Sequence, residues 1–386
     1  MGRFHEALAA PGLRAIAEVK RRSPSAGDLR PDADPARLAL QFGNAGAAAV
    51  SVLVDERFGG SLDDLRAARA ATPVPLLAKG FFTQEVQLLQ LKVAGADAVL
   101  LILRDVDDQR ARELLAYARE LGLDVLVEAH DADELHRAVA LGAEVIGINA
   151  RDLTTFEIDR SAQLELVSSA RPHERVIVAE SGVWTRAQGA AAELAGADAI
   201  LVGSALMRAP DPAAKLEELL SRPLVKVCGL TRQNDVDAAV EAGADLLGFI
   251  LAQASPRRAQ RVLDVPDDRL SVAVFVGEPE ETDADLVQLY RAEPGRVRGR
   301  EAALLRAGEQ VARVVDLPWD EDDPLHLQRA AAERGRVVLA GRLGPDNVGA
   351  AVAAVRPWAV DAASRLESAP GIKDHEKVRA FVDAAR

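Results

Sequence analysis

The chain has little cysteine, little histidine and no long apolar run. One cysteine in 386 residues excludes an internal disulfide framework, and six scattered histidines offer no metal-ligand spacing. No run of about 18 apolar residues exists, and the first residues, Met-Gly-Arg-Phe-His-Glu, contain no apolar signal core. These absences predict a cytoplasmic protein with a metal-free site, neither secreted nor embedded in a membrane.

Basic residues are also in deficit, with 47 against 60 acidic residues and a net charge of -13. This balance disfavours a surface built to hold nucleic acid or anionic lipid, so we predict neither as a partner. Any anionic ligand must then be held by local groups.

The length of 386 residues and the hydrophobic content of 49% are sufficient for two domains, each with its own core.

Helix-like segments that end in Gly-Ala and lead into an apolar run recur through the first part of the chain. Helical patterns such as Leu62–Ala71, Gln109–Leu121 and Asp133–Leu141 separate these runs, which indicates a parallel sheet covered on both faces. A closed (β/α)8 barrel suits this alternation better than an open doubly wound sheet, for which no Gly-x-Gly-x-x-Gly follows the first strand. The predicted strands are 14–20, 48–54, 75–80, 98–103, 124–129, 145–150, 176–181 and 199–204.

Polar side chains gather where these strands end. In the stretch Ile16 to Ser25, Glu18 and Lys20 are two residues apart, so both side chains point to one face of the first strand. Barrel enzymes place their chemistry at the carboxyl ends of the strands. A single charged strand end is commonly a solvated rim residue, but several together favour a site. The others are Lys79, Glu128, Asn149, Arg151, Glu180, Ser181, Gly203 and Ser204.

The residue types suggest roles for part of this set. Ser181-Gly182 and Gly203-Ser204 follow the last two strands, where barrels hold a phosphate on backbone N–H groups, although each could be an ordinary tight turn. Lys79 and Glu128 could act as general acid and general base, or form an ion pair in the barrel mouth. Phe58 and Phe81 could wall an aromatic substrate, although packing is the simpler interpretation for Phe58.

Six motifs then carry a resemblance to a known family. In order they are Ile16-Ala-Glu-Val-Lys-Arg-Arg-Ser-Pro-Ser25, Leu77-Ala-Lys-Gly-Phe81, Val127-Glu-Ala-His130, Ile146-Gly-Ile-Asn-Ala-Arg-Asp-Leu153, Ala179-Glu-Ser-Gly-Val183 and Leu201-Val-Gly-Ser204. Together they resemble indole-3-glycerol phosphate synthase over residues 13–208. The resemblance implies a tryptophan-pathway lyase that closes the indole ring of a phosphorylated anthranilate sugar, with loss of CO₂ and water and without a cofactor.

The resemblance also implies roles for individual residues. Lys79 would be the general acid and Glu128 the general base. The substrate would be oriented by Glu18, Lys20, Ser23, Asn149, Arg151 and Glu180, and its phosphate held by Ser181, Gly182, Gly203 and Ser204.

Three features depart from the family pattern. Gly80 stands where the family usually has Asp beside the lysine, and Ala150 replaces a small polar residue before Arg151. Only about a dozen residues precede the first strand, whereas the family carries a longer helical extension that covers the site. We therefore expect weaker substrate binding or slower turnover, which Michaelis constants would test.

A polar joint at Leu220-Ser-Arg-Pro223 divides the chain into predicted domains 1–221 and 222–386. The second part contains motifs that resemble phosphoribosylanthranilate isomerase over residues 224–382, among them Lys226-Val-Cys-Gly-Leu-Thr231, Ser255-Pro-Arg257 and Pro370-Gly-Ile-Lys-Asp374. The apolar runs predict seven strands, one fewer than a closed barrel needs. They are 224–229, 246–251, 270–276, 286–290, 310–317, 336–341 and 359–364.

This second resemblance is eroded. Cys228, the family's general base, and Arg257 are present, but the acid, its strand and the glycine-rich phosphate loop are missing between 317 and 336. We expect a degenerate, inactive barrel in which Cys228 is a small buried residue, with a protein partner or self-association covering its open edge. Three alternatives stay open: a synthase with an inert appendage, a bifunctional enzyme using Asp361 or Asp316 as substitute acid, and a non-enzymatic scaffold.

Overall fold

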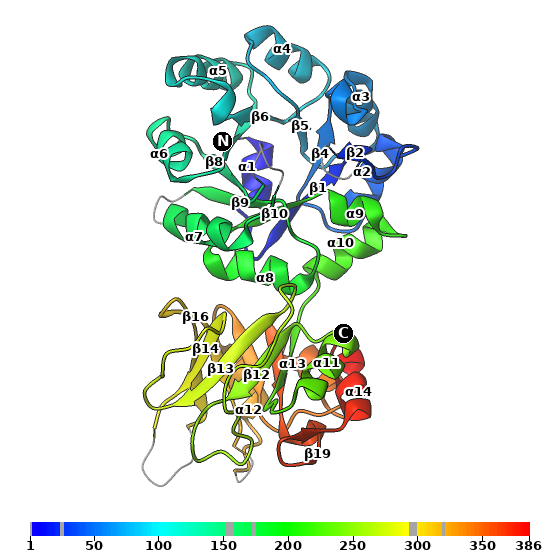
Figure 1. Ribbon diagram of the computed structural model, residues 1–386. Coiled ribbons are helices and arrows are strands. Elements are labelled where there is room, and N and C mark those ends of the chain that lie inside the picture. The colour runs from blue at the N-terminus through cyan, green and yellow to red at the C-terminus, as the bar shows by residue number, and fades with distance from the viewer. Residues whose placement is uncertain (1, 24–26, 152–156, 172–174, 293–298, 319–320) are drawn as a thin grey trace. The chain divides into compact units, whose positions relative to one another are not determined.

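The computed structural model describes residues 2–23, 27–151, 157–171, 175–292, 299–318 and 321–386. Pro24 and Ser25 of the predicted strand-end loop, and Asp152 and Leu153 of one motif, lie outside the described residues. The chain forms two compact units, one of residues 1–184 and 189–220 and the other of residues 185–188 and 221–386 (Figure 1). Each unit is built around its own barrel.

The first unit is a closed barrel of eight parallel strands. All eight predicted apolar runs are strands, and almost every strand residue is buried, because the barrel interior covers one face and the helices cover the other. In their order around the barrel the strands are β1 (Arg14–Val19), β4 (Ala49–Leu53), β5 (Leu76–Lys79), β6 (Ala98–Ile102), β7 (Asp124–Ala129), β8 (Val145–Asn149), β9 (Val176–Glu180) and β10 (Ala199–Val202).

Helices alternate with these strands and surround the barrel (Figure 1). Several begin at an Asp or Ser whose side chain accepts a hydrogen bond from a backbone N–H of the first turn, for example Ser61 and Asp131. The elements are α2 (Pro35–Asn44), η1 (Glu56–Phe58), α3 (Leu62–Ala71), α4 (Glu85–Val93), η2 (Leu103–Asp105), α5 (Asp108–Glu120), α6 (Ala132–Ala140), α7 (Arg160–Ala170), α8 (Arg186–Ala195), α9 (Ser204–Arg208) and α10 (Pro212–Leu220), with a small hairpin of β2 (Arg22–Ser23) and β3 (Gly27–Asp28).

The first helix, α1 (Arg3–Leu8), lies at the amino ends of the strands. Its backbone N–H groups at Gly2, Phe4 and His5 donate to the carboxylate of Asp124, the first residue of β7, at 2.8, 3.1 and 3.0 Å. The carboxylate therefore complements both the free N–H groups and the positive end of the helix dipole. Phe4 and Leu8 are fully buried. Thus α1 occupies the end of the barrel opposite the predicted site.

The second unit is also a closed barrel of eight strands, so the prediction of seven strands and an open edge is wrong. The eighth strand is β15 (Glu301–Arg306), which is antiparallel to both of its neighbours. With the edge paired, the expectation of a partner covering it loses its basis. The strands are β11 (Leu224–Cys228), β12 (Leu246–Ile250), β13 (Leu270–Val276), β14 (Leu286–Tyr290), β15, β16 (Glu309–Val315), β17 (Val337–Ala340) and β18 (Ala359–Ala362).

The missed strand has a local explanation. Its sequence, Glu-Ala-Ala-Leu-Leu-Arg, favours a helix by composition. It becomes a strand because Ala307 and Gly308, with φ of 48° and 81°, form a two-residue turn that folds it back on β16. Ala302 and Leu304 alternate inward and are buried.

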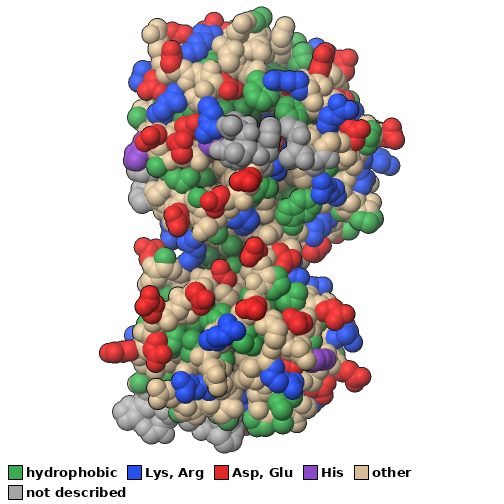
Figure 2. All heavy atoms as spheres, in the orientation of Figure 1, with side chains coloured by type: hydrophobic (Ala, Val, Ile, Leu, Met, Phe, Trp, Pro, Cys, Tyr) green, Lys and Arg blue, Asp and Glu red, His purple; other side chains and the backbone are tan. Residues whose placement is uncertain are grey.

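Between β16 and β17 the described residues form α12 (His326–Ala332) and no strand. However, β16 is itself the sixth strand of the closed barrel and the buried Asp316 directly follows it, so the prediction that this strand and an acid at its end are missing is wrong. The remaining elements are α11 (Gln233–Ala242), α13 (Val348–Val355), η4 (Ser364–Leu366), β19 (Glu367–Ala369), β20 (Ile372–Lys373) and α14 (His375–Ala385). Across the described part of the chain, no helix combines the length and apolarity that crossing a bilayer requires. Figure 2 shows Asp and Glu side chains interspersed with Lys and Arg over the visible face.

Candidate active site

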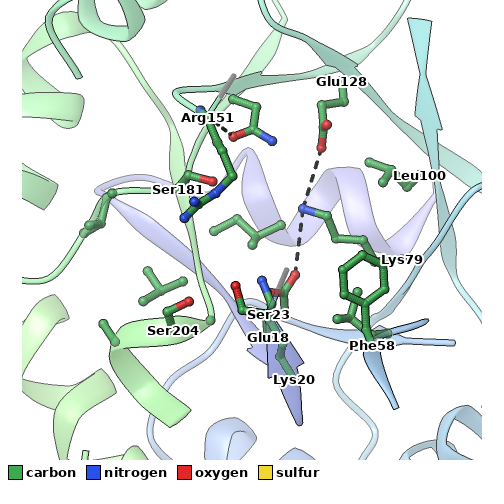
Figure 3. A pocket seen from close by; sticks show the side chains of 18 of the residues that line it. Glu18, Lys20, Ser23, Phe58, Lys79, Leu100, Glu128, Arg151, Ser181 and Ser204 are labelled. Carbon is green, nitrogen blue, oxygen red and sulfur yellow. Dashed lines mark hydrogen bonds and ion pairs between the residues drawn. The ribbon is translucent and has the colours of Figure 1, made fainter. Parts of the chain in front are cut away.

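At the carboxyl ends of four strands of the first barrel, one lysine lies among three glutamates. Lys79 is the last residue of β5, and its Nζ is 2.5 Å from Glu180 Oε2, 3.7 Å from Glu128 Oε2 and 3.8 Å from Glu18 Oε2. These glutamates stand at or near the ends of β9, β7 and β1. In Figure 3 the Lys79 side chain extends between Glu128 and Glu18. Parallel strands closed into a barrel thus bring together side chains that are distant in the sequence.

Lys79, Glu128 and Glu180 have pKa values shifted from their ordinary ones. Burial alone would lower the pKa of Lys79, but the charges of Glu180, Glu18 and Glu128 outweigh it and raise that pKa above its ordinary value. Burial would raise the pKa of Glu128, but Lys79 and His130 lower it to about 2. At Glu180 burial prevails, helped by the charge of Glu128, and the pKa rises to about 7. Two carboxyl groups whose pKa values are pushed apart can serve as base and as acid.

These groups open into a cavity of about 470 Å³. Every residue predicted for this barrel lines it except Glu180, which is fully buried and reaches the site through its contact with Lys79. The predicted residues that line it are Glu18, Lys20, Ser23, Lys79, Phe81, Glu128, Asn149, Arg151, Ser181, Gly182, Gly203 and Ser204. The sequence-based set is therefore brought together in one place.

One side of the cavity is suited to an anion. Ser181 and Gly182 directly follow β9 with positive φ of 68° and 73°, and Gly203 directly precedes α9. A Cβ on Gly203 would lie 2.5 Å from Glu18 Oε1, so this position admits no side chain without moving Glu18. In Figure 3, Ser181 and Ser204 lie on one side of the pocket, and Phe58 and Leu100 on the other.

The opposite side is aromatic. The rings of Phe58 and Phe81 are stacked with centroids 6.2 Å apart and planes 11° apart, and the Arg57 guanidinium lies 4.1 Å from the Phe81 centroid. Phe58 therefore packs against Phe81, which is the simpler interpretation given above, and it also lines the cavity. Arg57, Leu100 and Trp184 line it too and were missed from sequence. Arg57 and Trp184 follow strand ends, so the rule used for the other residues could have found them.

A further missed residue is Gly147, inside β8. A Cβ at this position would lie 2.0 Å from Glu180 Oε1. The glycine therefore makes room for the carboxyl group that contacts Lys79. Its signal in the sequence was a glycine in the interior of a strand, which commonly marks a close approach by another group.

In the second barrel, Cys228 is buried and Arg257 is paired with a carboxylate. Cys228 is buried, and burial raises the pKa of its thiol. Arg257 Nε donates to both carboxylate oxygens of Glu367 at 2.9 Å. The buried Lys226 Nζ donates to Gln288 Oε1 at 2.7 Å and to Asp361 Oδ2 at 2.8 Å.

The two proposed substitute acids are also engaged. Asp361 accepts the hydrogen bond from Lys226 at 2.8 Å, and Asp316 Oδ2 accepts one from the Tyr290 hydroxyl at 2.7 Å. Within the described residues of the chain, no group of His, Cys, Asp or Glu side chains could hold a metal ion.

The fold and the first site together define a class of protein. A (β/α)8 barrel with an ammonium group among carboxylates, and with glycine turns at the same end of its strands, is a barrel enzyme of the acid–base type with a place for an anion. Residues 2–219 match the family model described as indole-3-glycerol phosphate synthase, and the chain belongs to this family. Residues 323–384 match the model described as N-(5'phosphoribosyl)anthranilate (PRA) isomerase.

Individual relatives agree with this division. The indole-3-glycerol phosphate synthase of Nocardioides sp. is 51% identical over 53% of this chain and 78% of its own length. That of Mycobacterium ulcerans is 46% identical over 56% of this chain and 79% of its own length. The multifunctional tryptophan biosynthesis protein of Phycomyces blakesleeanus is 33% identical over 96% of this chain, which spans only 62% of that relative's length.

Among solved structures, the phosphoribosyl anthranilate isomerase from Thermus thermophilus is 28% identical, with 42% of this chain and 97% of that chain covered and a TM-score of 0.34.

Proposed function

We propose that the first barrel is an indole-3-glycerol phosphate synthase, which closes the ring of 1-(2-carboxyphenylamino)-1-deoxyribulose 5-phosphate with loss of CO₂ and water. The observation that carries this proposal is Lys79 Nζ within 3.8 Å of three glutamates in one cavity. Attack of the aromatic ring on the sugar carbonyl needs a proton for the developing alkoxide, and loss of water needs one proton removed and another supplied. The overall change is redox-neutral.

The protonation states support distinct roles for these groups. Lys79, held as an ammonium by the surrounding charges, is the general acid at the carbonyl oxygen. Glu128, ionised because its pKa is about 2, is the general base. Glu180 lies 2.5 Å from Lys79 Nζ and has a pKa of about 7, so it is the nearest group that can return a proton to Lys79 near neutral pH.

The remaining residues bind the two ends of the substrate. Ser181, Gly182, Gly203 and Ser204 hold the phosphate by hydrogen bonds, and Phe81 with Phe58 walls the anthranilate ring. Glu18, Lys20, Ser23, Asn149 and Arg151 line the cavity between these ends and orient the sugar and the carboxylate. A ring at the apolar side and a phosphate at the glycine turns place the reacting carbonyl near Lys79.

The test of this function is direct. Incubating the full chain with the carboxyphenylamino-deoxyribulose phosphate should produce indole-glycerol phosphate, followed by its fluorescence, together with an equal amount of CO₂ and without any added cofactor. A folded chain that produces neither would contradict the proposal and favour the scaffold alternative.

A second candidate function is isomerisation of N-(5-phosphoribosyl)anthranilate by the second barrel, which the family match over residues 323–384 favours. We propose that this barrel is inactive. Its Cys228 is a neutral buried thiol, and Asp361 and Asp316 are held by Lys226 and Tyr290. An isomerase needs a base and an acid free to exchange protons with the substrate.

This inactivity can be measured in the full chain carrying Lys79→Met, in which the first barrel would no longer consume the product of the second. We expect no carboxyphenylamino-deoxyribulose phosphate to accumulate from phosphoribosylanthranilate above the spontaneous rate. Enzyme-dependent accumulation that Cys228→Ser abolishes would show instead that the chain is bifunctional.

A further inference from the structure

His130 contacts Glu128 on the side away from Lys79. It follows the last residue of β7, two positions after Glu128, so the two side chains lie on the same face of the extended chain. Its Nε2 is 3.2 Å from Glu128 Oε1, and its Nδ1 is 3.0 Å from Glu134 Oε2. The imidazole side chain is only 4% exposed. A buried imidazole between two carboxylates is the arrangement that retains a second proton.

The far carboxylate is itself supported. Glu134 belongs to α6, and its Oε2 also accepts the backbone N–H of His130 at 2.8 Å. Its other oxygen, Oε1, accepts the Nε–H of Arg104 at 2.9 Å. A line of alternating charge therefore runs from η2 to the cavity. It consists of Arg104, Glu134, His130, Glu128 and Lys79.

The charged groups around His130 are mostly acidic. Glu128 comes from β7, Glu134 from α6, and Asp105 with Arg104 from η2. Burial alone would lower the pKa of His130, but Glu128 and Glu134 outweigh it and raise that pKa. The pKa of Asp105 is raised by burial and by the charge of Glu128. In this surrounding the imidazolium adds a second positive charge to that of Lys79, and both favour the ionised form of Glu128.

The two oxygens of Glu128 face different groups. Oε1 faces His130, whereas Oε2 faces Lys79 at 3.7 Å and makes no hydrogen bond within the described part of the chain. Oε1 thus lies at ion-pair distance from His130 Nε2, which makes no hydrogen bond among the described residues, and Oε2 is available on the cavity side. This is the geometry expected of a base that is fixed by a positioning group and takes its proton from a bound substrate.

We propose that His130 is a positioning residue that keeps Glu128 ionised and aimed into the cavity, with Glu134 and Arg104 as its support. The inference rests on the proposed synthase function, in which Glu128 is the general base. In the step concerned, a substrate proton passes to Glu128 as its bond to the substrate breaks and an O–H bond forms. His130 keeps its own proton throughout, so it acts through Glu128 and not on the substrate.

The first test compares His130→Gln with His136→Gln in the full chain. Glutamine has a similar reach but no charge, and His136 is an exposed residue on α6 whose Nδ1 lies 2.7 Å from the Ala132 carbonyl oxygen. We expect His130→Gln to lower kcat about tenfold to a hundredfold, because a base that loses its support is misplaced. The Michaelis constant should change less than about threefold. His136→Gln should match the wild type.

The pH dependence separates this role from a purely structural one. Without the imidazolium the pKa of Glu128 rises from about 2, so a larger fraction of the molecules carries a protonated Glu128 as the pH is lowered. The ratio of His130→Gln to wild-type kcat/KM should therefore fall as the pH decreases from about 8 to about 5. A pH-independent ratio, or a kcat within about twofold of wild type, would overturn the proposal.

A second measurement does not depend on activity or on the folding of His130→Gln. The imidazole of His130 can be titrated by NMR in the wild type, in Glu134→Gln and in Glu128→Gln. Its signal is assigned through its backbone, or as the signal that is absent from His130→Gln. Each variant removes one of the two carboxylates, so each should lower the His130 pKa. An unchanged pKa would refute the inference. If the wild type makes no indole product while these shifts occur, the synthase proposal fails and the coupling of His130 to Glu128 stands.

Discussion

Replacing Lys79 with methionine is expected to lower kcat/KM about a thousandfold to ten-thousandfold, because methionine is of similar length and supplies no proton and no positive charge. Lys79 Nζ lies 2.5 Å from Glu180 and within 3.8 Å of Glu128 and Glu18, and among the described residues no other cation is paired with all three. Steady-state formation of indole-glycerol phosphate measures the effect. Lys92→Met, on the outer helix α4, is the matched control and should retain full activity.

The same substitution should change the pH dependence of stability. Without the ammonium, the pKa values of Glu128 and Glu180 in the folded chain rise above the unfolded value of about 4.3. The folded chain then binds more protons than the unfolded chain, so the free energy of unfolding decreases as the pH rises above about 4.3. Lys79→Met should therefore be destabilised more at pH 8 than at pH 5 in urea titrations. An equal loss at both pH values would contradict the buried charge cluster.

Gly147→Ala is expected to lower kcat about a hundredfold, although it adds only one methyl group at a distance from the substrate. Its Cβ would lie 2.0 Å from Glu180 Oε1 and 3.3 Å from Leu126 Cδ1, so the Glu180 carboxyl group must turn away and lose its contact with Lys79. Overpacking of this kind also costs about 1–3 kcal/mol of stability. The measurements are kcat and urea unfolding of the same protein.

The matched control for this prediction is Gly189→Ala in α8, where the added Cβ meets Leu13 at 3.4 Å and Ile200 at 3.6 Å, which are ordinary contacts. In a helix this change should stabilise by about 0.5–1 kcal/mol and leave activity unchanged. If Gly147→Ala behaved like Gly189→Ala, Glu180 would not be confined by β8, and its proposed proton exchange with Lys79 would lose its structural basis.

Much of the first barrel could be predicted because its signals are local. Each strand is a short apolar run, and each strand end is marked by a polar residue, so Glu18, Lys79, Glu128 and Glu180 could be assigned to one rim by counting strands. Their gathering into one cavity then followed from closure of the barrel. The catalytic and binding roles of these residues remain predictions that the variants above test.

Other features depend on groups that are far apart in the sequence. The composition of β15 favours a helix, and it is a strand because β14 and β16 supply partners on both sides. The need for a glycine at 147 depends on where the Glu180 carboxyl group lies, and the support of His130 by Glu134 and Arg104 depends on the packing of α6 and η2. No short window of sequence contains these distances.

The sequence by itself determined the succession of barrel strands in the first unit, the end of that barrel that carries the chemistry and the residue types available there, because apolar period, turn chemistry and strand-end position are encoded locally. Only the tertiary structure decided that the second barrel closes, and how the charges divide between Glu128 and Glu180. Pairing of distant strands and the pKa of a buried group both depend on distances between residues that the chain brings together only when it folds.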